Sequence, residues 1–330
     1  MENNYPRLIA DIGGTYARLS IEESPFEYKN KTIYKCVEYL SFSHLFLSYL
    51  ESVNLSGKII AASIAVPSPI IDDSLFMINS PWEKVSISEV KSQLNIKDII
   101  FLNDFHALAL SLPFISKNNL VSIKESVNNN KDKPMIVIGP GTGLGMATLI
   151  NHPINGYYAL PAEGGRSTFT PVDDIEIELL KLGRQDFKHV SVERFLSGIG
   201  IKYIYECLSK IEENKNHKDI DTSEISLLAI NNQDEFAVKT LNIFCNMLGT
   251  ICSNFAVMTN SFGGVYIGGG IVPKILDFFI ASNFRNRFIS KGRYEMYLSQ
   301  IPIDVIIDKY AAFLGASYAL DTYLNKNYIP

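Results

Sequence analysis

The sequence predicts an α/β fold with two domains, in which one strand-turn-strand arrangement occurs twice. Residues 8–19 and residues 135–150 each contain an apolar run, a glycine-rich turn with a threonine, and a second apolar run. Residues 263–273 contain a third glycine-rich segment, a strand that enters three consecutive glycines and then a helix, with Pro273 near the first helical turn. Such a repeat is expected where two similar halves of one protein face a shared ligand.

The first half of the chain alternates strands with helices. A helix is expected at residues 43–53, with Ser41 or Ser43 as its cap, and a shorter one at residues 105–112, ended by Pro113. Apolar runs bounded by turn residues predict the strands, at residues 8–12, 17–22, 31–37, 59–66 and 99–102.

The second half is longer and richer in helix. A mostly apolar pattern predicts a long internal helix at residues 234–258, and a final helix is expected at residues 311–324. The polar runs at residues 128–133 and 212–218 are interpreted as solvated surface loops.

Bulk composition is that of a globular protein and excludes several functions. The 330 residues are 47% hydrophobic and 20% charged, and the net charge of −5 argues against binding that depends on neutralising nucleic-acid phosphates. We expect no apolar run long enough to span a membrane, because the best one, residues 59–71, is short and contains Pro67 and Pro69. The N-terminus does not have the form of a signal peptide.

The four cysteines show no C-x-x-C spacing. Cys245 and Cys252 are seven residues apart in a helical pattern, which places both on one buried helix face. We therefore expect core thiols in a reducing cytoplasm.

The glycine turns suit a phosphate ligand. Adjacent glycines such as Gly13 and Gly14 let backbone N–H groups approach a phosphate with no Cβ in the way. Asp11, at the end of the preceding strand, is placed to hold a hydrated Mg²⁺, which prefers one or two carboxylates plus substrate phosphates. Taken alone, these residues fit an ordinary hairpin turn equally well, and Arg18 is interpreted as an internal ion-pair residue rather than a phosphate ligand. No P-loop is present, and the Gly139–Gly145 turn leads into a strand where a dinucleotide fingerprint requires a helix.

Three acidic residues are candidates for chemistry on a substrate. Asp104 ends a strand and starts a helix, so its carboxylate would project beyond the strand ends, where ligands of open α/β sheets bind. From position alone, capping of the following helix is an equally good interpretation. Glu163 lies on a sharp turn that suits it to accept hydrogen bonds from adjacent hydroxyls, although a solvated loop acid would look the same. Glu193 also fits an acid that begins a helix.

The three glycine segments resemble the phosphate 1, phosphate 2 and adenosine motifs of the superfamily that contains sugar kinases, Hsp70 and actin. Within it, the chain is similar to the bacterial-type glucokinases along nearly its full length. The supporting stretches are Leu102–Phe105, Leu160–Gly165, His189–Gly198, Phe262–Pro273 and Lys291–Tyr294.

This resemblance implies a ribonuclease-H-like (actin-like ATPase) fold with an active-site cleft between two domains. A small domain at residues 1–113 would be completed by the C-terminal segment 311–330, and a large domain would span residues 114–310. The implied reaction is phosphoryl transfer from ATP·Mg²⁺ to the 6-hydroxyl of glucose, which gives glucose 6-phosphate. A homodimer is the family expectation, and we expect neither a nucleic acid nor a membrane as a partner.

The resemblance also assigns roles to residues. Asp104 would be the general base and would contact the sugar, and Asp11 would hold Mg²⁺ through water. The other sugar-binding residues would be Asn103, Glu163, Arg166 and Glu193. The nucleotide-binding residues would be Asp11, Gly13, Gly14, Thr15, Gly141, Thr142, Gly143, Gly269 and Gly270. We expect a side chain at Gly141 or Gly269 to occupy ligand space and to clash where φ is positive.

Two positions depart from the family pattern. Arg166 stands where these kinases usually have histidine, and Tyr16 stands where they usually have asparagine. A guanidinium does not replace an imidazole one-for-one, so the sugar preference stays open. The alternatives are a kinase for another hexose, such as mannose or an N-acyl amino sugar, and a non-catalytic sugar sensor. The choice of phosphoryl donor is open as well.

Overall fold

The computed structural model describes two compact units. Unit 1 comprises Met1–Lys117, His152–Pro161 and Asp308–Pro330, and unit 2 comprises Asn118–Asn151 and Ala162–Ile307. The residues described are 5–67, 70–77, 80–125, 130, 132–154, 156–212 and 219–325. Parts of four predictions lie outside them, namely Pro69, residues 128, 129 and 131 of the first polar run, residues 213–218 of the second, and residues 326–330 of the C-terminal segment.

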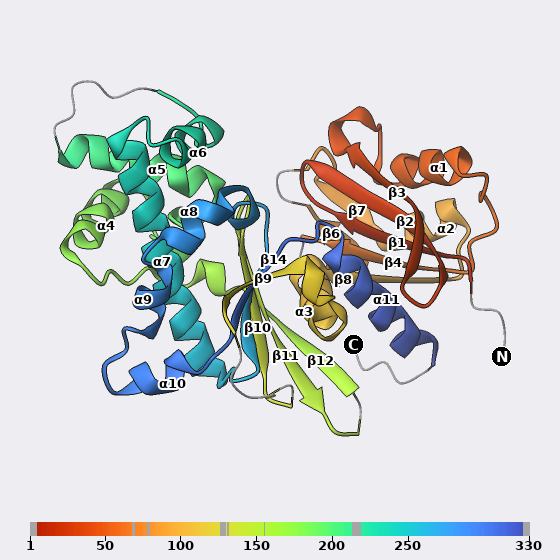
Figure 1. The fold of residues 1–330 in the computed structure, drawn as a ribbon. Coiled ribbons are helices and arrows are strands. Elements are labelled where there is room, and N and C mark those ends of the chain that lie inside the picture. The colour runs from red at the N-terminus through yellow and green to blue at the C-terminus, as the bar shows by residue number, and fades with distance from the viewer. Residues whose placement is uncertain are drawn as a thin grey trace. The chain divides into compact units, whose positions relative to one another are not determined.

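Unit 1 is built on a mixed sheet with the strand order β3-β2-β1-β4-β8 (Figure 1). Its strands are β1 (Arg7–Ile12), β2 (Tyr16–Ser24), β3 (Glu27–Lys35), β4 (Ala61–Val66) and β8 (Asp98–Asn103). β1 is antiparallel to β2 and parallel to β4, and β4 is parallel to β8. The carboxyl ends of β1, β4 and β8 therefore lie at one edge of the sheet. A small second sheet contains β5 (Ile70–Ile71), β6 (Ser74–Phe76) and β7 (Lys84–Ser86).

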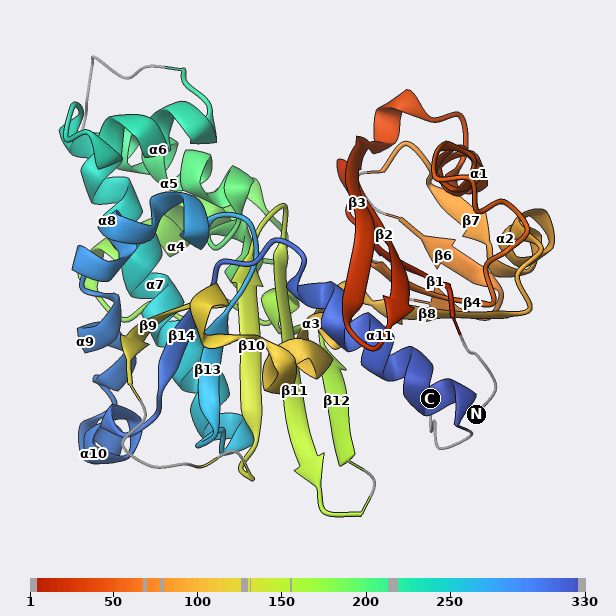
Figure 2. The same cartoon turned by 45° about the vertical axis from the view of Figure 1, so that its right-hand side comes forward.

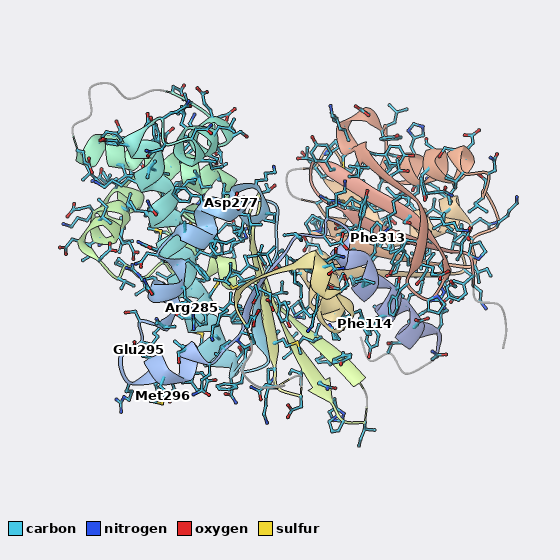
Figure 3. The ribbon with its side chains drawn as sticks, viewed as in Figure 1. Phe114, Asp277, Arg285, Glu295, Met296 and Phe313 are labelled. Carbon is cyan, nitrogen blue, oxygen red and sulfur yellow. The ribbon has the colours of Figure 1, made fainter. Side chains whose placement is uncertain are left out.

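The last helix of the chain belongs to unit 1 and packs against an early one. The helices of this unit are α1 (Phe42–Ser52), α2 (Ile87–Leu94), α3 (Asp104–Ser111) and α11 (Ala311–Leu324). α11 lies beside α3 in both views (Figures 1 and 2), and a Cβ on Gly315 would collide with the carbonyl oxygen of Ala107. Phe313 of α11 is fully buried, with its ring centroid 5.6 Å from that of Tyr28 (Figure 3). Glycine at position 315 thus allows the close approach that anchors the end of the chain.

Unit 2 contains most of a six-stranded sheet with the order β12-β11-β10-β13-β14-β9. Its strands are β9 (Leu120–Lys124), β10 (Met135–Pro140), β11 (Leu144–His152), β12 (Gly156–Ala162), β13 (Gly264–Ile267) and β14 (Ile303–Ile306). β10 is antiparallel to β11 and parallel to β13, as β1 is to β2 and β4. The predicted repetition of one strand-turn-strand arrangement is therefore confirmed.

Several helices of unit 2 pack against one long helix, α7 (Glu235–Thr259), which is predicted at residues 234–258. Asp234 caps α7 by accepting a hydrogen bond from the backbone N–H of Ala237. The other helices are α4 (Asp174–Asp186), α5 (Gly198–Ile211), α6 (Thr222–Ile230), α8 (Leu276–Ala281), α9 (Phe284–Ile289) and α10 (Glu295–Ser299). Cys245 and Cys252 of α7 are fully buried, and burial raises the pKa of the Cys245 thiol to about 12. The prediction of core thiols is confirmed, because Cys36 and Cys207 are also buried and free.

The expectation that no apolar run could span a membrane was wrong as a statement about length and composition. Among the helices that the structure describes, α7 is long and apolar enough to cross a bilayer. However, 67% of its most apolar window is buried inside the protein, which is typical of the core helix of a globular fold. Asparagine, serine and threonine residues interrupt the apolar residues of this helix, so it contains no unbroken apolar run of that length.

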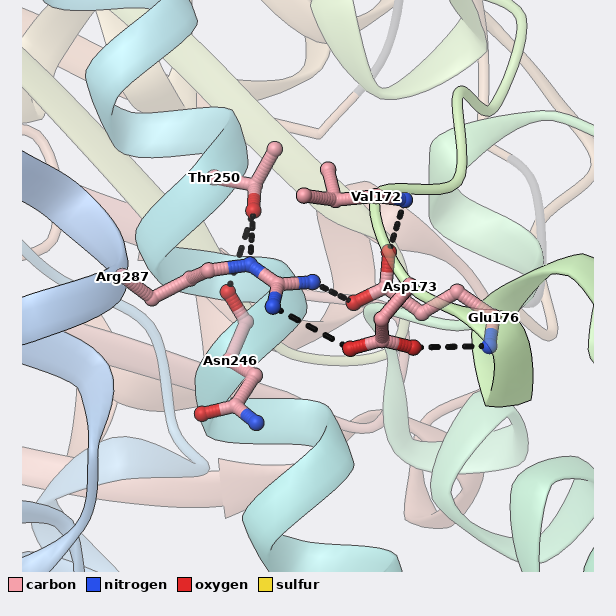
Figure 4. Close-up of polar contacts among 6 residues, drawn as sticks. All are labelled: Val172, Asp173, Glu176, Asn246, Thr250 and Arg287. Atoms are coloured by element: carbon pink, nitrogen blue, oxygen red, sulfur yellow. Dashed lines mark hydrogen bonds and ion pairs between the residues drawn. The ribbon is translucent and has the colours of Figure 1, made fainter. Parts of the chain in front are cut away.

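A buried ion cluster joins α4, α7 and α9 in unit 2 (Figure 4). The Nη1 atom of Arg287 lies 3.1 Å from Oδ2 of Asp173, and its Nη2 atom pairs with Oε1 of Glu176. The Nε atom of Arg287 donates a hydrogen bond of 2.9 Å to the Thr250 hydroxyl, and Glu176 accepts another from the backbone N–H of Val172. Glu176 is 1% exposed and Arg287 is 13% exposed, so both charges are largely removed from water. The cluster thus connects α4, α7 and α9, which are distant from one another in the sequence.

Some predicted elements differ at their ends. The strand predicted at residues 31–37 is β3, which begins at Glu27 and gives way to a 3-10 helix at Cys36–Glu38. The strand predicted from residue 59 begins at Ala61. Pro273 lies in a 3-10 helix, Val272–Ile275, that precedes α8, so the glycine segment does not enter an α-helix directly. Ser41 rather than Ser43 caps α1.

Candidate active site

The first glycine turn connects β1 to β2, and an aspartate of β1 forms an ion pair with an arginine of β2. The backbone N–H of Gly13 donates to the carbonyl of Tyr16 at 2.8 Å, which closes the turn. The Nη1 atom of Arg18 lies 3.0 Å from Oδ2 of Asp11, so the interpretation of Arg18 as an ion-pair residue is confirmed. Burial raises the pKa of Asp11, and the Arg18 charge opposes this shift. Gly14 and Thr15 complete the turn, with Thr15 exposed.

Asp11 has the properties that a site for a hydrated Mg²⁺ requires. One carboxylate oxygen is held by Arg18, and Oδ1 accepts no hydrogen bond from the described residues. Among those residues, no group of three or more His, Cys, Asp and Glu side chains is arranged to hold a metal. A single carboxylate beside a glycine turn fits an ion that keeps most of its water and takes its other ligands from phosphates.

Asn103 and Asp104 lie at the same sheet edge as Asp11. Asp11 pairs with Ala65 of β4, and the next residue of β4, Val66, pairs with Asn103 at the end of β8. Since neighbouring strands are about 4.8 Å apart, the backbones of Asp11 and Asn103 are separated by about 10 Å across two strand spacings. This edge of the sheet in unit 1 thus carries both Asp11, the expected Mg²⁺ ligand, and Asp104, the expected general base.

The cap of α3 is Asn103 and not Asp104. The Oδ1 atom of Asn103 accepts hydrogen bonds from the backbone N–H groups of Phe105 and His106, at 2.9 and 3.1 Å. Asp104 is the first helical residue, and its Oδ1 atom accepts from the Phe105 N–H at 2.8 Å. The alternative in which Asp104 serves only as the cap is therefore wrong, because the side chain before it satisfies the helix end.

In unit 2 the second glycine turn and the third glycine segment lie together. β10 and β13 are parallel neighbours, so Pro140, which ends β10, and Gly268, which follows β13, lie at adjacent strand ends. The Gly268 N–H donates to the carbonyl of Ile138 at 2.8 Å. Gly269 has φ of +77°, and a Cβ there would collide with the carbonyl oxygen of Pro140. Gly269 and Gly270 are exposed, which leaves their backbone accessible.

Gly141 differs from Gly269. Its φ is not positive, and a Cβ built on it meets no atom within 4 Å. The expected backbone clash at Gly141 is therefore wrong, and a side chain there would enter open space beside the turn. Thr142, the next residue, is exposed.

Glu193 reaches the second glycine turn from a different part of unit 2. It lies in a 3-10 helix, Val192–Arg194, and its Oε2 atom accepts a hydrogen bond of 2.9 Å from the backbone N–H of Leu144. Its Oε1 atom lies 2.9 Å from Nη1 of Arg166. Glu193 lies in the first turn of a helix, as expected, but its carboxylate bonds to Leu144 and Arg166, which are far away in the sequence.

Glu163 precedes the 3-10 helix Gly164–Arg166, and its carbonyl accepts a hydrogen bond from the Arg166 N–H at 2.9 Å. Its side chain is exposed. The structure therefore brings Glu163, Arg166, Glu193 and the 141–143 turn together in unit 2. Asn103, Asp104, Asp11 and the 13–15 turn belong to unit 1.

Gly198 contacts the second glycine turn, which the sequence did not predict. This first residue of α5 donates its backbone N–H to the carbonyl of Gly141 at 2.8 Å, while Ser197 caps the helix. The serine-glycine pair at a helix start was the available signal, but it says nothing about which loop the helix approaches.

The repeated hairpins, the acids at the strand ends and the glycine-lined turns define a two-domain sugar kinase of the actin-like ATPase fold. A family model described as Glucokinase matches residues 8–323. The chain is 39% identical to the glucokinase of Neisseria gonorrhoeae over 321 residues, which cover 97% of this chain and 96% of that one. It is also 39% identical to the glucokinase of Helicobacter pylori over 327 residues, with 97% of both chains covered.

Solved structures agree with these sequence relatives. A glucokinase from an Antarctic psychrotroph superposes with a TM-score of 0.84 at 31% identity, covering 96% of this chain and 99% of that one. A ROK family glucokinase from Streptomyces griseus, solved with glucose and AMPPNP, shares the fold with a TM-score of 0.65 at 17% identity. The chain belongs to the glucokinase family. It is accordingly an ATP-dependent enzyme that phosphorylates glucose.

Proposed function

We propose that Asp104 is the general base of this reaction and takes the proton from the 6-hydroxyl of glucose as the phosphoryl group arrives. The observation that supports this role is the cap of α3, which Asn103 provides, so capping of the helix does not account for Asp104. Asp104 also lies at the strand edge that carries Asp11, where ligands of parallel strands bind. A base at this place needs only to accept a proton, because phosphoryl transfer depends chiefly on positioning and charge stabilisation.

We propose that the glycine turns hold the nucleotide. Gly13, Gly14 and Thr15 in unit 1, with Gly141–Gly143 in unit 2, would offer backbone N–H groups to the phosphates. The exposed Gly269 and Gly270 would let the adenosine lie against bare backbone. These residues come from both units, so the proposal requires ATP to contact both.

We propose that Asp11 holds Mg²⁺ through water. When bound, the ion would neutralise the charge that develops on the phosphates. Arg18 fixes one oxygen of Asp11, and its charge opposes the rise in pKa that burial causes, which favours the ionised carboxylate beside the turn.

We propose that the sugar contacts Asn103 and Asp104 from unit 1 and Glu163, Arg166 and Glu193 from unit 2. Exposed or half-exposed carboxylates such as Glu163 accept hydrogen bonds from paired hydroxyls. Arg166 is 58% exposed and pairs with Glu193, so a guanidinium stands beside the proposed sugar site. This observation keeps a second hexose, such as mannose or an N-acyl amino sugar, as an alternative substrate beside glucose.

We also propose a cytoplasmic homodimer. The buried, free thiols support a reducing compartment. Light scattering on the purified protein tests the dimer, which would be rejected by a monomer mass at micromolar concentration.

One experiment tests the proposed function. ADP release is measured with glucose, mannose and N-acetylglucosamine for the wild-type enzyme and for Asp104→Asn. We expect turnover with glucose in the wild type and its loss in the variant, with glucose binding by calorimetry retained. Turnover by Asp104→Asn within threefold of the wild-type kcat would reject Asp104 as the base.

A further inference from the structure

The carboxylate of Glu193 bridges two loops of unit 2 that carry different parts of the proposed site. Its Oε2 atom accepts the Leu144 N–H at 2.9 Å, at the end of the 141–143 turn. Its Oε1 atom lies 2.9 Å from Nη1 of Arg166, at the end of the turn that begins with Glu163. One side chain thus connects the proposed sugar loop to the proposed phosphate turn.

Glycines on both sides make this bridge sterically possible. A Cβ on Gly143 would collide with Oε2 of Glu193, and a Cβ on Gly165 would collide with the carbonyl oxygen of Leu144. The phosphate turn and the sugar loop therefore close around the Glu193 carboxylate and the Leu144 backbone without room for even a methyl group. A rotation of Glu193 would remove a hydrogen bond from the turn.

Among the described residues, the pairing of Pro140 with Leu144 and two backbone hydrogen bonds also restrain the turn. Gly141 donates its N–H to the carbonyl of Gly143, and its own carbonyl accepts the N–H of Gly198, both at 2.8 Å. The bond from Leu144 to Glu193 is charge-assisted, which makes it about twice as strong as a neutral hydrogen bond. The orientation of Glu193 therefore has a direct effect on the backbone that would face a phosphate.

We propose that Glu193, held by Arg166, couples sugar binding to nucleotide binding. Arg166 orders the carboxylate before either ligand arrives, and a sugar hydroxyl that donates to Glu193 orders it further. Whichever ligand binds first lowers the cost of ordering the shared carboxylate for the second, so the two affinities are linked reciprocally. Arg166 is accordingly a positioning residue for the phosphate turn. This inference rests on the proposed sugar and nucleotide sites.

The test is calorimetric binding of a non-hydrolysable ATP analogue to the full-length enzyme, with and without saturating glucose. Arg166→Met should weaken analogue binding about two- to fivefold without glucose, because partly exposed ion pairs contribute up to about that much. With glucose bound, the hydroxyl contact orders Glu193 again, and the loss should shrink to less than twofold. The variant therefore shows a larger glucose-nucleotide coupling than the wild type.

Three further variants separate positioning from general damage. Arg166→Lys keeps the charge and should recover at least half of the lost analogue affinity in the absence of glucose. Glu193→Ala should lower the coupling below the wild-type value, since the shared carboxylate is gone and only coupling through the joint contacts with both units is left. Lys181→Met breaks an ion pair of similar exposure, Lys181 to Glu178 at 2.7 Å, and should change neither affinity nor coupling.

An Arg166→Met enzyme with wild-type analogue affinity in the absence of glucose would overturn the proposal. So would a coupling factor that Glu193→Ala leaves unchanged. The proposed site itself fails by a different result, in which the wild-type enzyme binds the analogue and glucose but Glu163→Ala and Gly141→Val change neither affinity.

Discussion

Arg18 and Asp11 form an ion pair of 3.0 Å across the first hairpin of unit 1. Burial raises the pKa of Asp11, and the guanidinium limits that rise. A carboxylate must be ionised to hold a metal ion, so activity is expected to fall as the pH drops through this raised pKa. If Asp11 holds Mg²⁺ as proposed, this ion pair is expected to set the acid limit of the enzyme.

Arg18→Met should move the acid limb of the kcat/KM profile to higher pH. Loss of the positive charge raises the pKa of Asp11 further, so the carboxylate is protonated earlier as the pH falls. The KM for Mg²⁺ should rise over the same pH range. Lys29→Met, which breaks the exposed pair with Glu23 on the same sheet, serves as the control and should leave both quantities unchanged. An acid limb that does not move in Arg18→Met would contradict the role of Asp11.

Asp104→Asn should lower kcat by about 10²–10⁴-fold while the protein stays folded. The amide oxygen of asparagine can still accept the Phe105 N–H that Asp104 Oδ1 accepts, so α3 keeps its first turn. The matched variant Asn103→Ala removes the helix cap and should destabilise unit 1 by about 1 kcal/mol. Steady-state kinetics and chemical denaturation distinguish the two, and equal losses of stability would show that Asp104 acts structurally.

Gly141→Val should impair ATP binding, whereas Gly269→Ala should impair the stability of the protein. A Cβ at Gly141 meets nothing within 4 Å, and the φ of Gly141 is not positive. The variant should therefore have the stability of the wild type. Its KM for ATP should rise at least tenfold with little change in the KM for glucose, because the side chain fills ligand space. Gly269 has φ of +77° and faces the Pro140 carbonyl, so even alanine there should lower the melting temperature. Equal effects of Gly141→Val on both KM values would argue against a nucleotide role for this turn.

Arg287→Met should destabilise unit 2 by about 3–5 kcal/mol, because it leaves the buried carboxylate of Glu176 without its partner. Burial raises the pKa of Glu176, and Arg287 is a charge that opposes this shift. Without Arg287 the folded protein binds the Glu176 proton still more tightly than the unfolded chain does. Stability is then lost as the pH rises through the folded pKa, so the deficit should be smaller at pH 5 than at pH 8.

Urea denaturation of Arg287→Met at both pH values measures this effect. The double variant Arg287→Met with Glu176→Gln should regain part of the loss at pH 8, since no buried charge remains unpaired. A deficit below about 1 kcal/mol, independent of pH, would show that the cluster is not a significant restraint.

Glucose should draw the two units into a more compact arrangement. The proposed sugar contacts come from Asn103 and Asp104 in unit 1 and from Glu163 and Glu193 in unit 2. A ligand that contacts both units favours the arrangement in which all its contacts form. Small-angle scattering should give a smaller radius of gyration at saturating glucose, and Glu163→Ala should need more glucose for the same change. A radius that glucose leaves unaltered would count against sugar contacts from both units.

Much of the fold could be predicted because its signals are local. The pair of Asp11 and Arg18 lies within one hairpin, where strand register brings residues seven apart into contact. The caps of α1 and α7 and the repeated glycine turns follow from backbone geometry within a few residues. Asn103 is an exception, since the sequence pointed to Asp104 as the possible cap, although asparagine caps helices equally well by residue type. Only the dihedral angles of Asn103, which are extended, decided between them.

The sequence by itself determined the order of the glycine turns, the acids that follow strands, the core thiols and the family resemblance. The tertiary structure alone decided where Glu193 binds, because its partner Leu144 is 49 residues away and is reached only when separate loops pack together. The same holds for Arg287 and Glu176, which are 111 residues apart. A charged side chain can form hydrogen bonds and ion pairs with many partners or with water, so its partner cannot be predicted from its residue type. Packing of the strands and helices makes that choice by deciding which loops meet.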